Sequence, residues 1–111
     1  MSTNYMKKKY IIRKNEQIQK IVKTSKKLVN KYFIVYFRNN DFQYNRYCIS
    51  VSKKLGKAHT RNLYKRRIKD ILIKNNINNS MDYVIILRNA VIGITYEEMQ
   101  YELLNILKGD K

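Results

Sequence analysis

The segment from Tyr83 to Arg88 constrains the fold most, because apolar side chains follow one another there without a polar interruption until the arginine. Such a run is typical of a strand that is covered on both faces rather than exposed on one. A chain of 111 residues suits one domain with a modest core. We therefore expect a single layered domain, residues 1–111, in which this strand is packed from both sides.

Periodicity and turn residues predict the elements that precede this strand. Apolar residues at helical spacing, with Asn15 placed to cap them, predict a short helix from Glu16 to about Thr24. Aromatic and β-branched side chains predict strands at Tyr32–Phe37 and Arg46–Ser52, with a shorter one at Leu28–Val29. Since the two longer strands are close in sequence, we expect them to pair antiparallel.

Two further helices complete the predicted order. One follows the break at Gly56 and runs from about Ala58 to Lys74. The last one opens on a capping box formed by Thr95 and Glu98 and ends near Gly109. The order α-β-β-(β)-α-β-α predicts an α+β fold with a sheet of about four strands, preceded by a basic arm at residues 1–14 that we expect to be extended or loosely held.

The charge is large and unevenly distributed. Lysine and arginine number 24 against 8 acidic residues, a net charge of +16. Residues 1–81 carry 21 basic and 3 acidic side chains, whereas residues 82–111 carry 3 basic and 5 acidic ones. This balance indicates a polyanionic partner for the first part of the chain. A membrane surface is the rival polyanion, but no apolar run approaches the roughly 18 residues of a membrane span and no signal-peptide core is present, so we expect a cytoplasmic protein without a membrane partner.

The residue inventory argues against a catalytic or zinc-binding polypeptide. Cys48 and His59 are the only cysteine and histidine, so neither a disulfide nor a Cys/His metal cluster can be assembled within the chain. Before residue 82 the only carboxylates are Glu16, Asp41 and Asp70, on three separate elements. A two-metal nuclease needs convergent carboxylates, so we do not expect the catalytic groups on this chain.

The predicted helix at Ala58–Lys74 separates its apolar residues from its cations. At about 100° per residue, the apolar residues gather on one side, where they can dock the helix: Tyr64, Ile68, Ile71 and Leu72. An adjoining arc of about 140° holds Arg61, Asn62, Lys65, Arg66 and Lys69. The remaining residues of this part of the helix are expected to point toward the solvent or the rim: Leu63, Arg67, Asp70 and Lys74. Like charges repeated at i and i+4 weaken an isolated helix, and a polyanion would relieve that repulsion. For the charge run taken alone, a plain solvated face is the alternative.

The spacing around this helix resembles the signature of the bacterial ribonuclease P protein. The motif reads Ser52-Lys53-Lys54-Leu55-Gly56-Lys57-Ala58, then Arg61-Asn62, then Lys65-Arg66. Leu63 stands where that family usually has a third basic residue. The similarity extends outward to the basic arm, Lys14–Glu16, Ile49–Ser52, Tyr83–Arg88 and Thr95–Glu98.

The resemblance implies a function and a set of site residues. It implies a protein that binds a large catalytic RNA and the 5′ leader of precursor tRNA, while the RNA carries out magnesium-dependent hydrolysis that removes the leader. It implies a compact α-β sandwich with a left-handed crossover through the basic helix. The matching RNA-binding residues are Lys53, Lys54, Arg61, Asn62, Lys65, Arg66 and Lys69. Those matching the leader cleft are Ile18, Val22, Ile34 and Tyr36. It assigns Mg²⁺ to the RNA and leaves protein-bound metal unknown.

Three other functions remain open on the residues alone. A ribosomal or other structural RNA-binding protein would be equally small and basic, and would sediment with ribosomal subunits. A nucleoid protein would prefer duplex DNA over precursor tRNA. An autonomous nuclease would cleave without RNA.

Overall fold

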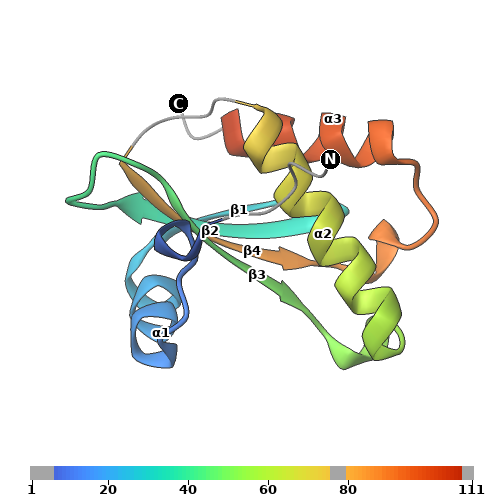
Figure 1. The fold of residues 1–111 in the computed structure, drawn as a ribbon, viewed down its shortest axis with the longest axis horizontal. Helices are drawn as coiled ribbons and strands as arrows, with labels where there is room; N and C mark the ends of the chain where they lie inside the picture. Colours follow the sequence, from blue (N-terminus) through green and yellow to red (C-terminus); the bar gives the residue numbers. More distant parts are fainter. Residues whose placement is uncertain (1–6, 76–79, 109–111) are drawn as a thin grey trace.

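The computed structural model describes residues 7–75 and 80–108 and arranges them in three layers, with a central sheet covered by helices on both sides (Figure 1). Helix α1 lies on one face of the sheet, and helices α2 and α3 lie on the other. The elements follow one another as η1 (Lys8–Tyr10), α1 (Asn15–Thr24), β1 (Lys26–Val29), β2 (Phe33–Asn39), β3 (Arg46–Val51), η2 (Lys53–Leu55), α2 (Ala58–Lys74), β4 (Met81–Leu87), η3 (Asn89–Val91) and α3 (Tyr96–Lys108). This order confirms the predicted α+β arrangement, including the short strand at Leu28–Val29.

The order of strands in the sheet differs from the expected antiparallel pairing of β2 with β3. The sheet has the order β1-β2-β4-β3, so β4 lies between the two strands. β4 is antiparallel to β2 and parallel to β3, and α2 makes the crossover between the parallel pair. The prediction of a β2–β3 pair was wrong because β4 lies between them. All residues of β4 except the half-buried Ile86 are buried, since helices cover both of its faces and β2 and β3 pair with both of its edges. The left-handed sense of the crossover stays a prediction of the resemblance.

Two apolar clusters fill the spaces on either side of the sheet. The larger lies under α2 and α3, where Phe33, Val35 and Phe37 of β2 meet side chains such as Ile68 and Leu103. The smaller lies on the α1 side, between Ile12, Ile21 and Val84. Burial of the alternate residues of one strand in opposite clusters follows from the two-residue period of β structure.

The N-terminal arm is more firmly attached than its charge suggested. Ile11 forms a parallel bridge with Tyr47, and the Ile12 amide donates to the Tyr47 carbonyl at 2.8 Å. Ile12 is only 3% exposed. The arm therefore covers part of the outer edge of β3, because its apolar residues can be buried there, and it is not loosely held at this point. Residues 1–6 of the predicted arm lie outside the described residues.

Two local predictions about polar residues need correction. Asn15 is the first residue of α1 rather than its cap, and Lys14 occupies the cap position without a side-chain hydrogen bond. Asp70, expected at the solvent or the rim, is buried between α2 and α3. It accepts a short hydrogen bond from the Tyr96 hydroxyl and pairs with Lys74 at 3.1 Å, and these contacts lower the pKa of its carboxyl. Burial, together with the hydrogen bond to Asp70 and the charge of that carboxylate, raises the pKa of Tyr96 to about 12.

Candidate RNA interface

Helix α2 docks through its apolar stripe, as predicted, and its cations are exposed or half-buried. Tyr64, Ile68, Ile71 and Leu72 are buried. Asn62 and Arg66 are exposed, and Arg61, Lys65 and Lys69 are half-buried. Together with Lys53 and Lys54, which are exposed in the preceding turn, we call this surface the cationic face: Lys53, Lys54, Arg61, Asn62, Lys65, Arg66 and Lys69.

The cationic face is not neutralised from within. In residues 7–75 and 80–108, the ion pairs involve Arg38, Arg46 and Lys74, and none involves a residue of the cationic face. The first turn of α2 also lacks an acidic residue and a side-chain cap, whereas α3 begins with Glu97 and Glu98. Unpaired N–H groups and the helix dipole therefore add positive potential beside Lys53 and Lys54.

The turn before α2 orients the start of this face. The Ser52 hydroxyl accepts a hydrogen bond from the Lys54 amide at 3.2 Å, and Leu55 is buried as an anchor. Gly56 follows with φ +144°, and its carbonyl accepts a hydrogen bond at 3.2 Å from Nε of Arg61. This bond restrains the guanidinium of Arg61 through Nε.

We expect Gly56→Ala to destabilise the protein by about 1–3 kcal/mol, because the backbone conformation at Gly56 is one that only glycine adopts without strain. An added Cβ would also lie 3.2 Å from Cγ2 of Thr60. Unfolding in urea measures the effect. Gly93→Ala separates the two causes: Gly93 has φ +90°, so its substitution brings backbone strain, but apart from its chain neighbours no heavy atom lies within 4 Å of the new Cβ. A Gly56→Ala variant as stable as the unsubstituted protein would contradict this account of the turn.

A cavity connects the cationic face with the edge of the sheet. Its volume is about 160 Å³, and its lining comes from the arm, β3 and α2: Ile11, Ile12, Tyr47, Cys48, Ile49, Lys65 and Lys69. Burial raises the pKa of the Cys48 thiol, and the nearby charge of Lys65 only partly offsets this. The thiol therefore stays protonated near neutral pH, and the cavity joins two ammonium groups to an apolar wall.

The residues predicted for the leader cleft lie on the α1 side of the sheet, where Cys48 of β3 also packs. On the α1 side, the strand register aligns Tyr36 with Val84 and Cys48. Ile18 and Val22 of α1 pack against the same cluster as Tyr36 and Cys48. Ile34 is half-buried on the same side of β2, in register with Ile86, but it lies outside that cluster. The structure thus brings three of the four residues together and places the fourth beside them.

A lysine from the edge strand adds charge to this surface. Nζ of Lys27, which is in register with Tyr36, lies 6.0 Å from the centre of the tyrosine ring. A cation beside an aromatic face favours a phosphate and a base at neighbouring positions. Sequence reasoning did not select Lys27, because its position opposite Tyr36 depends on the β1–β2 register.

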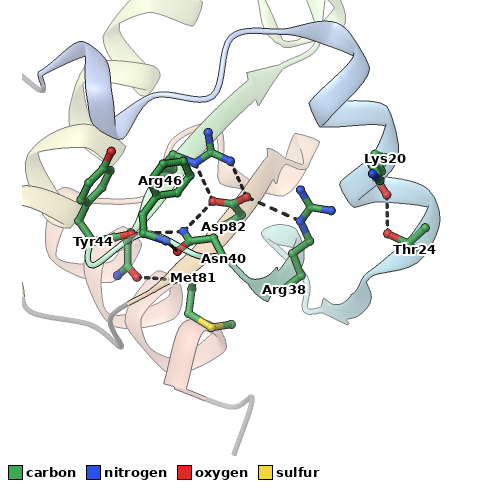
Figure 2. Close-up of polar contacts among 10 residues, drawn as sticks. Lys20, Thr24, Arg38, Asn40, Tyr44, Arg46, Met81 and Asp82 are labelled. Atoms are coloured by element: carbon green, nitrogen blue, oxygen red, sulfur yellow. Dashed lines mark hydrogen bonds and ion pairs between the residues drawn. The ribbon is translucent and has the colours of Figure 1, made fainter.

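We call a set of residues in register across β2, β4 and β3 a row. On the α1 side, the row next to that of Tyr36 contains a buried carboxylate held by two arginines (Figure 2). Asp82 is fully buried, and its carboxylate accepts hydrogen bonds from Nε and Nη2 of Arg46 at 2.9 and 2.7 Å. The Asn40 amide donates to it at 2.8 Å, and Arg38 lies 3.7 Å away. Burial alone would raise the pKa of Asp82, but these hydrogen bonds and charges outweigh it and hold the pKa below the usual 3.8.

Sequence reasoning missed this cluster. An acidic residue at the start of an apolar strand was the available signal, but its partners come from β2 and β3, which only the observed strand order places on either side of β4. The cluster neutralises a buried acid that lies beneath the basic surface. It also fixes Arg38 and Arg46 beside the Tyr36 row.

These features define a class of protein: a small basic α+β domain with one helix face and one adjoining sheet face suited to a polyanion. Residues 6–109 match the family described as Ribonuclease P. The chain belongs to this ribonuclease P protein family, which supplies a subunit of a ribonuclease and implies an RNA partner.

Relatives in several bacteria support the assignment over almost the whole chain. The ribonuclease P protein component of Mycoplasma mycoides is 39% identical over 110 residues, covering 96% of this chain and 100% of that protein. That of a Geobacillus species is 42% identical over 106 residues, covering 93% and 91%. The structure of the Thermotoga maritima RNase P protein matches with a TM-score of 0.84 at 34% identity, covering 90% of this chain and 96% of that one. The structure of the Staphylococcus aureus RNase P protein matches with a TM-score of 0.83 at 37% identity, covering 92% of this chain and 95% of that one.

Proposed function

We propose that this protein binds the catalytic RNA of ribonuclease P and the 5′ leader of precursor tRNA, and so assists endonucleolytic removal of the leader. The supporting observation is that the cationic face has no ion pair within the described residues and adjoins the α1 side of the sheet through the cavity at Cys48. The catalytic groups are assigned to the RNA, and the chain positions and neutralises phosphates. The family match favours this function over the ribosomal alternative.

The two surfaces suit different parts of the RNA. On the cationic face, the planar guanidinium groups of Arg61 and Arg66 fit phosphate oxygens, and Asn62 can donate to and accept from a base edge or ribose hydroxyl. We assign this face to structured catalytic RNA. On the α1 side, Tyr36 presents an aromatic ring between aliphatic neighbours. We assign this side to the single-stranded leader, whose bases are free to stack.

Mg²⁺ is the metal we assign to the holoenzyme, with the RNA as its ligand. Within the described residues, no group of three or more His, Cys, Asp or Glu side chains gathers to hold a metal ion. The chain's contribution is its own positive charge, which lowers the repulsion between catalytic RNA, leader and tRNA. None of the helices in residues 7–75 and 80–108 combines the length and apolar character needed to cross a bilayer. We place the protein in the cytoplasm because its proposed RNA partners are there.

Adding this protein to its cognate catalytic RNA is expected to raise the rate of precursor-tRNA cleavage most at low Mg²⁺. The reason is that fixed cations on the protein replace part of the screening that the metal otherwise provides. The measurement is the cleavage rate across a magnesium titration, with and without protein.

Protein without RNA serves as a control and should not cleave. Equal rates with and without protein at every magnesium concentration would refute the proposed function. Cleavage by protein alone would refute the assignment of the catalytic groups to the RNA.

A further inference from the structure

Three aromatic rings lie next to one another where β3 begins. The rings of Tyr10 and Tyr44 meet edge to face with centroids 5.2 Å apart, and those of Phe42 and Tyr44 are tilted with centroids 5.3 Å apart. Tyr10 comes from η1 within the arm, and the other two come from the turn between β2 and β3. We call these three rings the aromatic patch.

Cations are interleaved with the rings of the aromatic patch. Nζ of Lys9 lies 5.1 Å from the centre of the Tyr10 ring and 5.0 Å from that of Tyr44. The guanidinium carbon of Arg46 lies 4.5 Å from the centre of the Phe42 ring. Asp82 holds Arg46 in place through two hydrogen bonds. The guanidinium against which the Phe42 ring packs is therefore fixed.

Packing alone does not account for the exposed part of this patch. Tyr10 also contacts the large apolar cluster, which explains its position. Phe42, however, is 40% exposed, and Lys9, which lies beside Tyr10 and Tyr44, is exposed as well. An amide hydrogen bond from Phe42 to the Asn40 side chain at 2.8 Å shapes the turn that presents the ring. Against these cations the turn carries a single exposed carboxylate, that of Asp41.

The aromatic patch continues the surface assigned to the leader. On the α1 side, the row of Arg38, Asp82 and Arg46 lies two residues along the strands from the row that contains Tyr36. Two residues of extended strand correspond to about 7 Å. A single strand lying on Tyr36 would therefore meet Arg38 and Arg46 next and Phe42 beyond them.

We propose that the aromatic patch is a second stacking site for single-stranded RNA, which holds the part of the leader that extends past the Tyr36 row. Phe42 and Tyr44 offer π faces to bases, Lys9 and the partly exposed Arg38 face the phosphates, and Arg46 positions Phe42. Stacking on aromatic side chains tolerates any base, so this contact adds affinity without sequence preference. The inference rests on the proposed function and adds leader length as a determinant of affinity.

The test measures the affinity of the reconstituted holoenzyme for precursor tRNAs whose leaders increase in length. With unsubstituted protein, affinity should rise as the leader becomes long enough to reach the aromatic patch. Phe42→Leu, which keeps an apolar side chain but removes the ring, should weaken binding of long leaders about fivefold or more and leave the shortest leader unchanged. Tyr44→Leu should act in the same direction, and Phe42→Tyr should restore the affinity for long leaders.

Tyr101→Ala is the matched control, since Tyr101 is a tyrosine on α3 that is 65% exposed. It should bind every leader as the unsubstituted protein does. If Phe42→Leu and Tyr44→Leu bind all leaders normally, or weaken short and long leaders equally, the aromatic patch is not a leader contact. If unsubstituted holoenzyme shows no affinity that depends on a leader at all, the proposed function fails first, and this inference with it.

Discussion

The double variant Arg61→Ala/Lys65→Ala is expected to bind the catalytic RNA more weakly and with a flatter dependence on salt. Each phosphate contact releases condensed counterions, and its loss reduces the slope of log K against log salt by about 0.7–0.9. Both cations lie on the cationic face and have no carboxylate partner in the described residues, so their charge is available to RNA. We expect the slope to fall by about 1.5 for the pair. Filter binding or fluorescence anisotropy between about 50 and 200 mM salt measures it.

The control must remove the same net charge from elsewhere. Lys31 lies in the turn between β1 and β2, and Lys108 lies in the last turn of α3, and both are exposed. Lys31→Ala/Lys108→Ala should leave the slope close to that of the unsubstituted protein. A general effect of net charge would instead flatten both slopes equally. That result would reject a localised RNA interface on α2.

Asp82→Ala is expected to lower the free energy of unfolding by about 3–5 kcal/mol, the usual result of removing one partner from a buried ion pair. The side chain of Arg46 is only 14% exposed, so the substitution would leave a largely buried guanidinium without its carboxylate. Urea unfolding at neutral pH measures the loss. Asp41→Ala is the control, because Asp41 is exposed and its substitution should change stability by less than about 0.5 kcal/mol. Equal effects of the two substitutions would contradict the role given to Asp82.

The same carboxylate predicts how stability depends on pH. The pKa of Asp82 is lower in the folded protein than the ordinary 3.8, so folding favours its ionised form. Its contribution is complete above pH 3.8 and is lost as the pH falls through the lower, folded value. Asp82→Asn should therefore flatten the acid limb of the stability profile, although Asp70, whose pKa is also lowered, keeps part of it. An unchanged acid limb would show that Asp82 does not titrate as described.

Local sequence patterns were sufficient for the elements and for the main candidate surface. The stripe of Tyr64, Ile68, Ile71 and Leu72 correctly predicted which side of α2 is buried. The capping signal at Thr95 was also correct, since its hydroxyl accepts from the Glu98 amide at 3.0 Å. Such features depend on residues within a few positions of one another, and helical and strand periods relate those residues without any knowledge of the fold.

The tertiary structure decided which distant elements meet. The sequence by itself determined the secondary structure, a strand covered on both faces and a helix with a cationic face. Only the fold inserted β4 between β2 and β3, and this placed Arg38 and Arg46 beside Asp82. Only the fold brought the arm to β3, and this placed Tyr10 against Tyr44. The reason is that strand order depends on how much apolar surface each arrangement covers across the whole sheet, and nearness in sequence does not determine that sum.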